Sequence, residues 1–316
     1  QIGEFAIRNK DKLSSKYVKH FGLKSAIACQ VLQKYGRNKK IKRISSIKLI
    51  NPGQAINVNQ VNRTVYISCL KFIFSYRFRN DFIKVNQIEI DNKYIYVSVT
   101  IPEKPQIETK NYIGVDLNTT GHLAVVSNPE TGKVLKLGKK ANHIHIKYKN
   151  IRRDLQKKSK YRKIKKIKNR ESNIIKDLNH KISKKIVDKA VEDKCGIKLE
   201  KLEGIRNNKK HSKSFKYSLN SWSFFQLQKM IEYKAKLQGI PVVYIEPAYT
   251  SKLCSRCGHL GYRNDKLFKC SFCGHVENAD VNASFNIALR QENISQFDID
   301  RDILKGSTDT PKEATL

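Results

Sequence analysis

Acidic residues are scarce in this 316-residue chain. Asp and Glu number 28 against 63 Lys and Arg, which leaves a formal net charge of +35 at pH 7. Such an excess of one sign opposes compaction through self-repulsion, and a polyanionic partner relieves it. The basic residues are too many and too clustered for a solvated surface to be the favoured explanation. Nucleic acid is the first candidate partner, with phosphate contacts supplying affinity.

Long apolar runs are missing as well. No stretch approaches the roughly 18 consecutive apolar residues that a transmembrane helix needs, and no long amphipathic basic helix favours a membrane surface. No signal peptide is visible, although the chain begins at Gln1 rather than at Met. We expect no membrane partner and a cytoplasmic, nucleoid-associated protein, and the oligomeric state stays open.

Cysteines are few and unevenly placed. Four of the seven form two CxxC pairs, whereas Cys29, Cys69 and Cys195 stand alone in mostly apolar surroundings. An odd number, with lone cysteines in expected core positions, argues for a reducing compartment.

The paired cysteines have the spacing of a structural zinc site. They follow the pattern CxxC-x12-CxxC, and the four are Cys254, Cys257, Cys270 and Cys273. Each pair, with its following glycine, forms a turn that points two thiolates at one tetrahedral ion. His259 and His275 follow these glycines and could compete as ligands, but four cysteines already complete the coordination. Because protein ligands fill every position, we predict a structural rather than a catalytic zinc.

The first hundred residues change pattern near residue 46. Apolar residues recur at helical spacing over residues 11–35, which predicts a helix there. Short β-type runs then follow at 55–58, 64–68, 72–74, 87–90 and 94–99. Asp91 and Asn92 form a plausible hairpin turn. We predict a helical segment over residues 1–45 and a small antiparallel barrel or sheet over residues 46–108.

A different order of elements begins at Tyr112. The run 112–117 is apolar on both sides of Asp116, as a buried central strand would be. Two more strands complete a meander, and they are followed by basic helices (141–190), a strand (196–200), a helix (221–237), a strand (240–245) and a last helix (279–289). This is the order of an α/β RNase H-like fold. We predict a nuclease domain over 109–248 and 277–290, a zinc ribbon over 249–276 and a disordered tail over 291–316.

Three acids fall where that fold gathers its carboxylates. Asp116 lies inside the first strand, Glu200 ends the fourth strand, and Asp280 begins the last helix. A charge inside a buried strand is costly unless it is paired or binds a metal. Each acid alone has an ordinary explanation, such as a salt bridge or a helix N-terminus. Together they predict a nuclease site in which two Mg²⁺ ions activate water and stabilise the leaving oxygen of a phosphodiester.

The most basic segment, residues 139–170, contains almost no acids. Its thin apolar stripe and wide cationic face predict one or two helices that bind phosphates, in preference to a merely solvated face. Nucleic-acid contacts are predicted for Arg152, Arg153, Lys157, Lys158, Arg162, Lys163, Lys165 and Lys166. The polar loop 204–217 is expected to be mobile and to act as a gate for single-stranded DNA.

Four stretches resemble the TnpB (OrfB) family of insertion-sequence proteins, which are relatives of type V CRISPR effectors. They read VDL from Val115, KLEKL from Lys198, EPAYTSKLCSRCG from Glu246 and NADVNASFNI from Asn278. The resemblance implies a RuvC-like nuclease domain whose catalytic acids are Asp116, Glu200 and Asp280. Glu203 is close to Glu200, but Glu200 ends the apolar strand as the family's Glu does, and Glu203 is expected in the following loop.

The resemblance further implies a guide RNA, double-stranded target DNA cut beside a short flanking motif, and a wedge-type domain after a helical recognition part. Only 115 residues precede Asp116, which is short for this family. We expect an RNA-guided, Mg²⁺-dependent DNA endonuclease encoded by a transposable element, in which the zinc ribbon shapes the DNA path and fixes the helix of Asp280. The alternatives are a nuclease-inactive RNA-guided DNA-binding repressor and a DNA-joining transposase.

Overall fold

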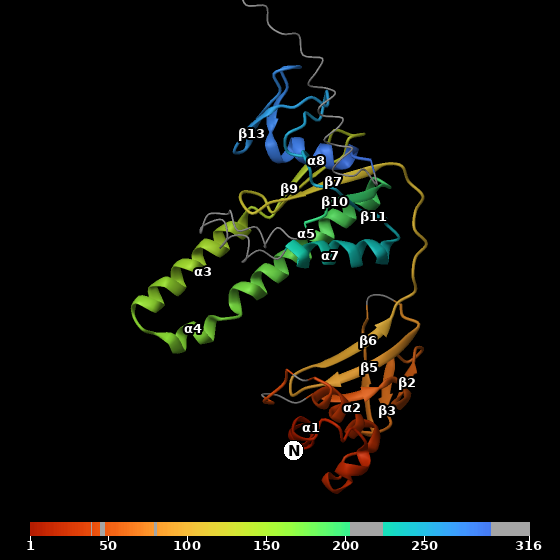
Figure 1. The fold of residues 1–316 in the computed structure, drawn as a ribbon. Helices are drawn as coiled ribbons and strands as arrows, with labels where there is room; N and C mark the ends of the chain where they lie inside the picture. The colour runs from red at the N-terminus through yellow and green to blue at the C-terminus, as the bar shows by residue number, and fades with distance from the viewer. Residues whose placement is uncertain (39, 45–47, 79–80, 203–223, 292–316) are drawn as a thin grey trace, which may run out of the picture. The chain divides into compact units, whose positions relative to one another are not determined.

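The chain divides into two compact units, Gln1–Pro102 and Glu103–Leu316 (Figure 1). The computed structural model describes residues 1–38, 40–44, 48–78, 81–202 and 224–291. The predictions for Glu203, for the loop 204–217 and for the tail beyond Gln291 lie outside these ranges. Within them, no helix is both long and apolar enough to cross a bilayer.

The helical part of the first unit consists of three short helices. These are α1 (Ile2–Arg8), the 3-10 helix η1 (Ser15–Phe21) and α2 (Ser25–Gly36). The prediction of helix over residues 11–35 is confirmed for η1 and α2, but the helix is interrupted at residues 22–24 and does not include residues 11–14. Gly22 ends η1 with a φ of 73°, a left-handed conformation that glycine adopts without steric cost.

Two three-stranded antiparallel sheets complete the first unit, with the orders β1-β5-β6 and β2-β3-β4. The strands are β1 (Leu49–Pro52), β2 (Ile56–Asn59), β3 (Thr64–Ile67), β4 (Phe72–Ser75), β5 (Lys84–Ile90) and β6 (Ile95–Thr100), with a short 3-10 turn η2 (Gly53–Ala55) after β1. The five predicted strands are present, and β1 is an addition. Asp91 accepts hydrogen bonds from the amides of Lys93 and Tyr94, which closes the predicted turn between β5 and β6.

The second unit is built on a five-stranded sheet of order β11-β10-β7-β8-β9. The strands β7 (Tyr112–Leu117), β8 (Ala124–Ser127) and β9 (Val134–Leu137) form the predicted meander. The strands β10 (Gly196–Glu200) and β11 (Val242–Ile245) extend the sheet in parallel from β7.

Helices cover both faces of this sheet (Figure 1). On one face, α5 (Arg170–Glu192) and α7 (Phe224–Gln238) enclose the main apolar core, whereas α8 (Ala279–Leu289) lies on the other face against β7. The basic region forms α3 (Lys140–Lys157), α4 (Tyr161–Ile167) and α5, so it contains three helices rather than one or two. The strands β12 (Tyr262–Asn264), β13 (Leu267–Lys269) and β14 (Val276–Asn278) form a separate small sheet between β11 and α8.

Gly114 allows α8 to lie directly on β7. A Cβ atom at this position would overlap the carbonyl oxygen of Ser284 and the backbone of Ala288. On the same side of the sheet, the hydroxyl groups of Ser127 and Ser284 share a 2.5 Å hydrogen bond. Small residues therefore set a close spacing between α8 and the strand that carries Asp116.

Candidate metal centres and nucleic-acid surfaces

The four paired cysteines converge on one point. Their Sγ atoms all lie within 4.8 Å of one another. The Sγ–Sγ distances are 3.7 Å for Cys254 and Cys273 and 3.6 Å for Cys257 and Cys270. Tetrahedral zinc with Zn–S bonds of about 2.3 Å holds its sulfur ligands about 3.8 Å apart. The cluster therefore fits one zinc ion.

The two neighbouring histidines are not part of this cluster. His259 donates from Nδ1 to the carbonyl oxygen of Cys257 at 3.1 Å, and its ring stacks on Phe272 with a centroid distance of 3.7 Å. His275 is buried beside the ring of Phe268. Among the described residues, the cluster therefore consists of the four predicted cysteines, without either histidine.

The three predicted acids lie on neighbouring elements. Asp116 is near the end of β7, Glu200 is the last residue of the parallel strand β10, and Asp280 is in the first turn of α8. Side chains alternate along a strand, so Asp116 and Glu200 lie on the same face as Gly114, the face that α8 covers. One edge of the sheet brings the three carboxylates together.

The ionisation of Asp116 is costly in this position. Burial raises its pKa most, and the negative charges of Glu200 and Asp280 raise it further, to about 8. Asn118 donates from Nδ2 to Asp116 Oδ2 at 2.8 Å and offsets this in part. Burial also raises the pKa of Glu200. A cation bound among these carboxylates would lower the cost of ionising Asp116, so the raised pKa is consistent with a cation-binding site.

Glu200 and Asp280 each interact with different neighbouring side chains. Thr250 donates from its hydroxyl to Glu200 Oε1 at 2.5 Å. The Nζ of Lys266 lies 2.9 and 2.7 Å from the two carboxylate oxygens of Asp280, and an Arg263 nitrogen lies 3.4 Å from one of them. Both cations belong to the β12–β13 hairpin of the cysteine module.

The donor set at the acids is made of carboxylate and carboxamide oxygens, the hard ligands that Mg²⁺ prefers. The chemistry of the site therefore fits Mg²⁺. The carboxylates are less tightly gathered than the thiols: within the described ranges, the cysteines are the one group of three or more His, Cys, Asp or Glu side chains with mutually close ligand atoms.

Two carboxamides of α8 tie the chain before the cysteine module to this helix. Asn282 and Asn286 each donate to the carbonyl oxygen of Leu253 at 2.7 Å, and Asn286 also donates to that of Thr250. The backbone amide of Ser255 donates back to Asn282. The module, the residue that contacts Glu200 and the helix that carries Asp280 thus form one hydrogen-bonded assembly.

Sequence reasoning missed four partners of the acids, namely Asn118, Thr250, Arg263 and Lys266. Thr250 lies within the EPAYTSKLC stretch, which offered a signal, and Asn118 follows Asp116 by two residues. Nothing in the local sequence distinguishes Lys266 from other lysines, because its contact with Asp280 joins residues 14 positions apart on different elements.

Seven of the eight basic residues predicted to contact nucleic acid have exposed side chains on α3, α4 and the turn between them. They are Arg153, Lys157, Lys158, Arg162, Lys163, Lys165 and Lys166. Arg152 differs, because its guanidinium contacts the buried carboxylate of Glu171, whose other oxygen lies 2.7 Å from His145. Figure 1 shows α3 and α5 extending from the sheet, with α4 joining their far ends.

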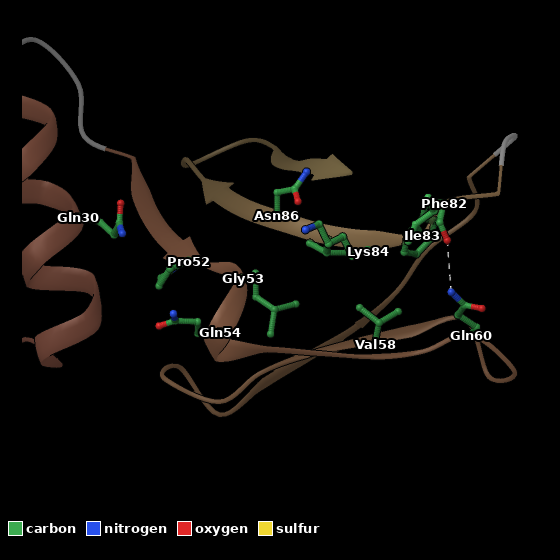
Figure 2. A pocket seen from close by; sticks show the side chains of 12 residues that line it. Gln30, Pro52, Gly53, Gln54, Val58, Gln60, Phe82, Ile83, Lys84 and Asn86 are labelled. Carbon is green, nitrogen blue, oxygen red and sulfur yellow. Dashed lines mark hydrogen bonds between the residues drawn. The ribbon is translucent and has the colours of Figure 1, made fainter. Parts of the chain in front are cut away.

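The first unit contains a cleft of about 730 Å³ (Figure 2). Carboxamides dominate its polar lining, which comprises Gln30, Gln54, Gln60 and Asn86. Lys84 is the one charged residue of the lining, and Ile56, Val58 and Val85 supply apolar walls. A carboxamide presents a donor beside an acceptor, the pattern that the edge of a nucleobase can match.

Comparison with known proteins gives matches over most of the chain. A family model described as the Cas12f1-like TNB domain matches residues 224–287. A TnpB-like protein of Methanocaldococcus jannaschii is 33% identical over 279 residues, which cover 83% of this chain and 96% of that protein. The CRISPR-associated endodeoxyribonuclease Cas12f1 of Sulfoacidibacillus thermotolerans is 42% identical over 115 residues, which are 35% of this chain and 26% of that nuclease.

Two cryo-EM structures of Cas12f complexes share the fold. A CRISPR–Cas12f ternary complex aligns with a TM-score of 0.50 at 18% identity and covers 93% of this chain and 81% of that chain. A Cas12f1–sgRNA–target DNA complex aligns with a TM-score of 0.51 at 23% identity and covers 65% of this chain and 45% of that chain. At these identities the likeness is one of fold.

Proposed function

Because the chain belongs to the family of TnpB-like proteins, we propose that it is a transposon-encoded, RNA-guided endonuclease that hydrolyses phosphodiester bonds of target DNA. The observation that carries the proposal is the meeting of Asp116, Glu200 and Asp280 at one edge of the sheet, with the pKa of Asp116 raised by burial and by the other two carboxylates. We assign the five-stranded sheet and α8 to a RuvC-like nuclease domain, and residues 46–108 to a wedge-type domain that follows the helical recognition segment.

The three acids are the proposed ligands of Mg²⁺, two ions in all. When bound, Mg²⁺ supplies Lewis-acid activation of water and neutralises charge on the leaving oxygen. The chain's own residues prepare the site: Thr250 fixes the carboxylate of Glu200 through its 2.5 Å hydrogen bond, and Asn118 orients Asp116. Zinc in the cysteine module is structural, because four thiolates leave no open position for chemistry.

The proposed partners are a guide RNA and double-stranded target DNA. The exposed cations of α3 and α4 would contact the phosphates of the RNA or of the RNA–DNA heteroduplex. In the first unit, the cleft lined by Gln30 and Gln54 is suited to base edges, because carboxamides pair with adenine through two hydrogen bonds. Pairing with the guide would read most of the target sequence.

The test begins with the RNA that the protein carries. The protein is purified from its host, the bound RNA is sequenced, and the complex is incubated with a plasmid matched to that RNA. We expect Mg²⁺-dependent cutting of the matched plasmid and none of a mismatched one. Cutting that ignores the RNA would contradict the proposal, and matched binding without cutting in Mg²⁺ or Mn²⁺ would indicate a repressor instead.

A further inference from the structure

Lys266 connects two of the three acids. Its Nζ lies 2.7 and 2.9 Å from the carboxylate oxygens of Asp280 and 3.5 Å from Oδ1 of Asn118. Asn118 in turn donates to Asp116 at 2.8 Å. One ammonium group and one carboxamide therefore bridge the carboxylate of α8 and that of β7.

The backbone holds this lysine where it is. Lys266 lies in the tight connection between β12 and β13, and its carbonyl oxygen accepts a 2.9 Å hydrogen bond from the amide of Ala279, the first residue of α8. Its side chain is 29% exposed, whereas that of Asp280 is 4% exposed. The contact between Lys266 and Asp280 thus joins the β12–β13 hairpin to α8, and the lysine side chain covers the buried carboxylate.

The position of the ammonium has a consequence for cation binding. Lys266 occupies both oxygens of Asp280, so a divalent ion that uses this carboxylate must share or displace the ammonium. A fixed positive charge a few ångströms from a divalent ion also repels it. Arg263, at 3.4 Å from one oxygen, contributes a weaker contact of the same sign.

We propose that Lys266 is a positioning residue of the acid centre: its ammonium is an internal counter-cation that holds Asp280 and Asn118 together and gives way when a divalent metal binds. This inference rests on the proposed function, because it assumes that the acids bind metal. The hairpin of the cysteine module thereby sets the affinity of the acid centre for its metal.

The experiment measures Mn²⁺ binding by electron paramagnetic resonance to the zinc-loaded protein without nucleic acid. The variants are Lys266→Gln, the charge-preserving Lys266→Arg and the control Lys269→Gln, which neutralises an exposed lysine of the same hairpin. Since removing a nearby positive charge favours a dication, we expect Lys266→Gln to bind Mn²⁺ at least about fivefold more tightly. Lys266→Arg and Lys269→Gln should bind like the parent, and only Lys266→Gln should lower the melting temperature of the Mn²⁺-free protein.

One further variant separates this inference from the function on which it rests. If Asp116→Asn binds Mn²⁺ as the parent does, the acids are not the metal site and the proposed function fails. If Asp116→Asn loses Mn²⁺ while Lys266→Gln binds it no more tightly than the parent, the role of Lys266 is overturned and the proposed metal site stands.

Discussion

The ammonium of Lys198 on strand β10 donates a 3.2 Å hydrogen bond to the carbonyl oxygen of Ala288, near the end of α8. It also donates to the carbonyl of Arg290 at 2.7 Å and lies 4.5 Å from the ring centroid of Tyr112. The last carbonyls of a helix have no intrahelical donor, and this buried lysine supplies one. The contact fixes the far end of the helix that begins beside Asp280.

Lys198→Met tests this anchor, because it keeps an unbranched side chain and removes the donor. We expect the free energy of unfolding to fall by about 1–3 kcal/mol, the cost of buried polar groups left without a partner. Urea unfolding gives the value. The control is Lys201→Met just beyond the same strand, which is exposed and should change stability by less than about 0.5 kcal/mol. Parent-like stability of Lys198→Met would refute the anchor.

The pKa of Asp116 predicts how stability depends on pH without Mg²⁺. Burial and the neighbouring carboxylates raise this pKa from 3.8 to about 8, so the folded state binds the proton more tightly than the unfolded state. The contribution of Asp116 to the free energy of unfolding is therefore favourable at low pH, and it is lost as the pH rises from about 4 to about 8.

Asp116→Asn removes this titration. At pH 8 we expect the Mg²⁺-free variant to melt above the parent, by about 2–4 °C for each kcal/mol relieved, whereas at pH 4 the two should melt together. Melting curves recorded across this range supply the comparison. If the melting temperatures of the parent and of Asp116→Asn changed in parallel with pH, the pKa of Asp116 would not be raised in the folded protein.

Loss of zinc is expected to abolish the proposed DNA cleavage, although the proposed role of zinc is structural. Cys254→Ser removes one of the four sulfur ligands, so we expect the bound zinc to fall well below one ion per chain. We expect cutting to fail as well, because the cysteine module that anchors α8 through Asn282 and Asn286 loses its support. Elemental analysis and a plasmid assay give the two values. Cys29→Ser, outside the cluster, should keep both zinc and cutting; full activity of zinc-free Cys254→Ser would oppose this account.

The exposed cations of α3 and α4 predict a salt-dependent affinity for RNA. Changing them to Gln should flatten the slope of log K against log salt by about 0.7–0.9 for each phosphate that the protein no longer neutralises. The changed residues are Lys157, Lys158, Arg162, Lys163, Lys165 and Lys166. The control neutralises Lys181 and Lys184, which face Asp177 and Asp188 on α5. An unchanged slope would contradict the proposal that α3 and α4 contact the RNA.

Local sequence patterns sufficed to predict much of the second unit. Apolar runs predicted β7 and the strands that follow it, and the run 279–289 predicted α8, because these signals lie within one element. The first unit was harder: the apolar spacing of residues 11–35 continues across Gly22, where the backbone turns, and β1 is a strand of four residues whose pairing with β5 is remote in sequence.

The same distinction separates the predicted site residues from their partners: the former were recognisable within one sequence segment, and the latter were not. Asp116 stood out as a charge in an apolar run, and the cysteines stood out by their spacing. Thr250 and Lys266 act through contacts that exist only after the cysteine module has folded beside α8. Periodicity carries no information about such contacts, so only the structure identifies them.

The role of the acid centre is tested by the cleavage, in Mg²⁺, of a plasmid matched to the bound RNA by the parent and by Asp116→Ala. Both proteins are first shown to carry the RNA and to bind the plasmid, so that a loss of cutting reports on the acid centre alone. We predict that the parent cuts at the matched site and that Asp116→Ala does not. Equal cutting by the two proteins would contradict it.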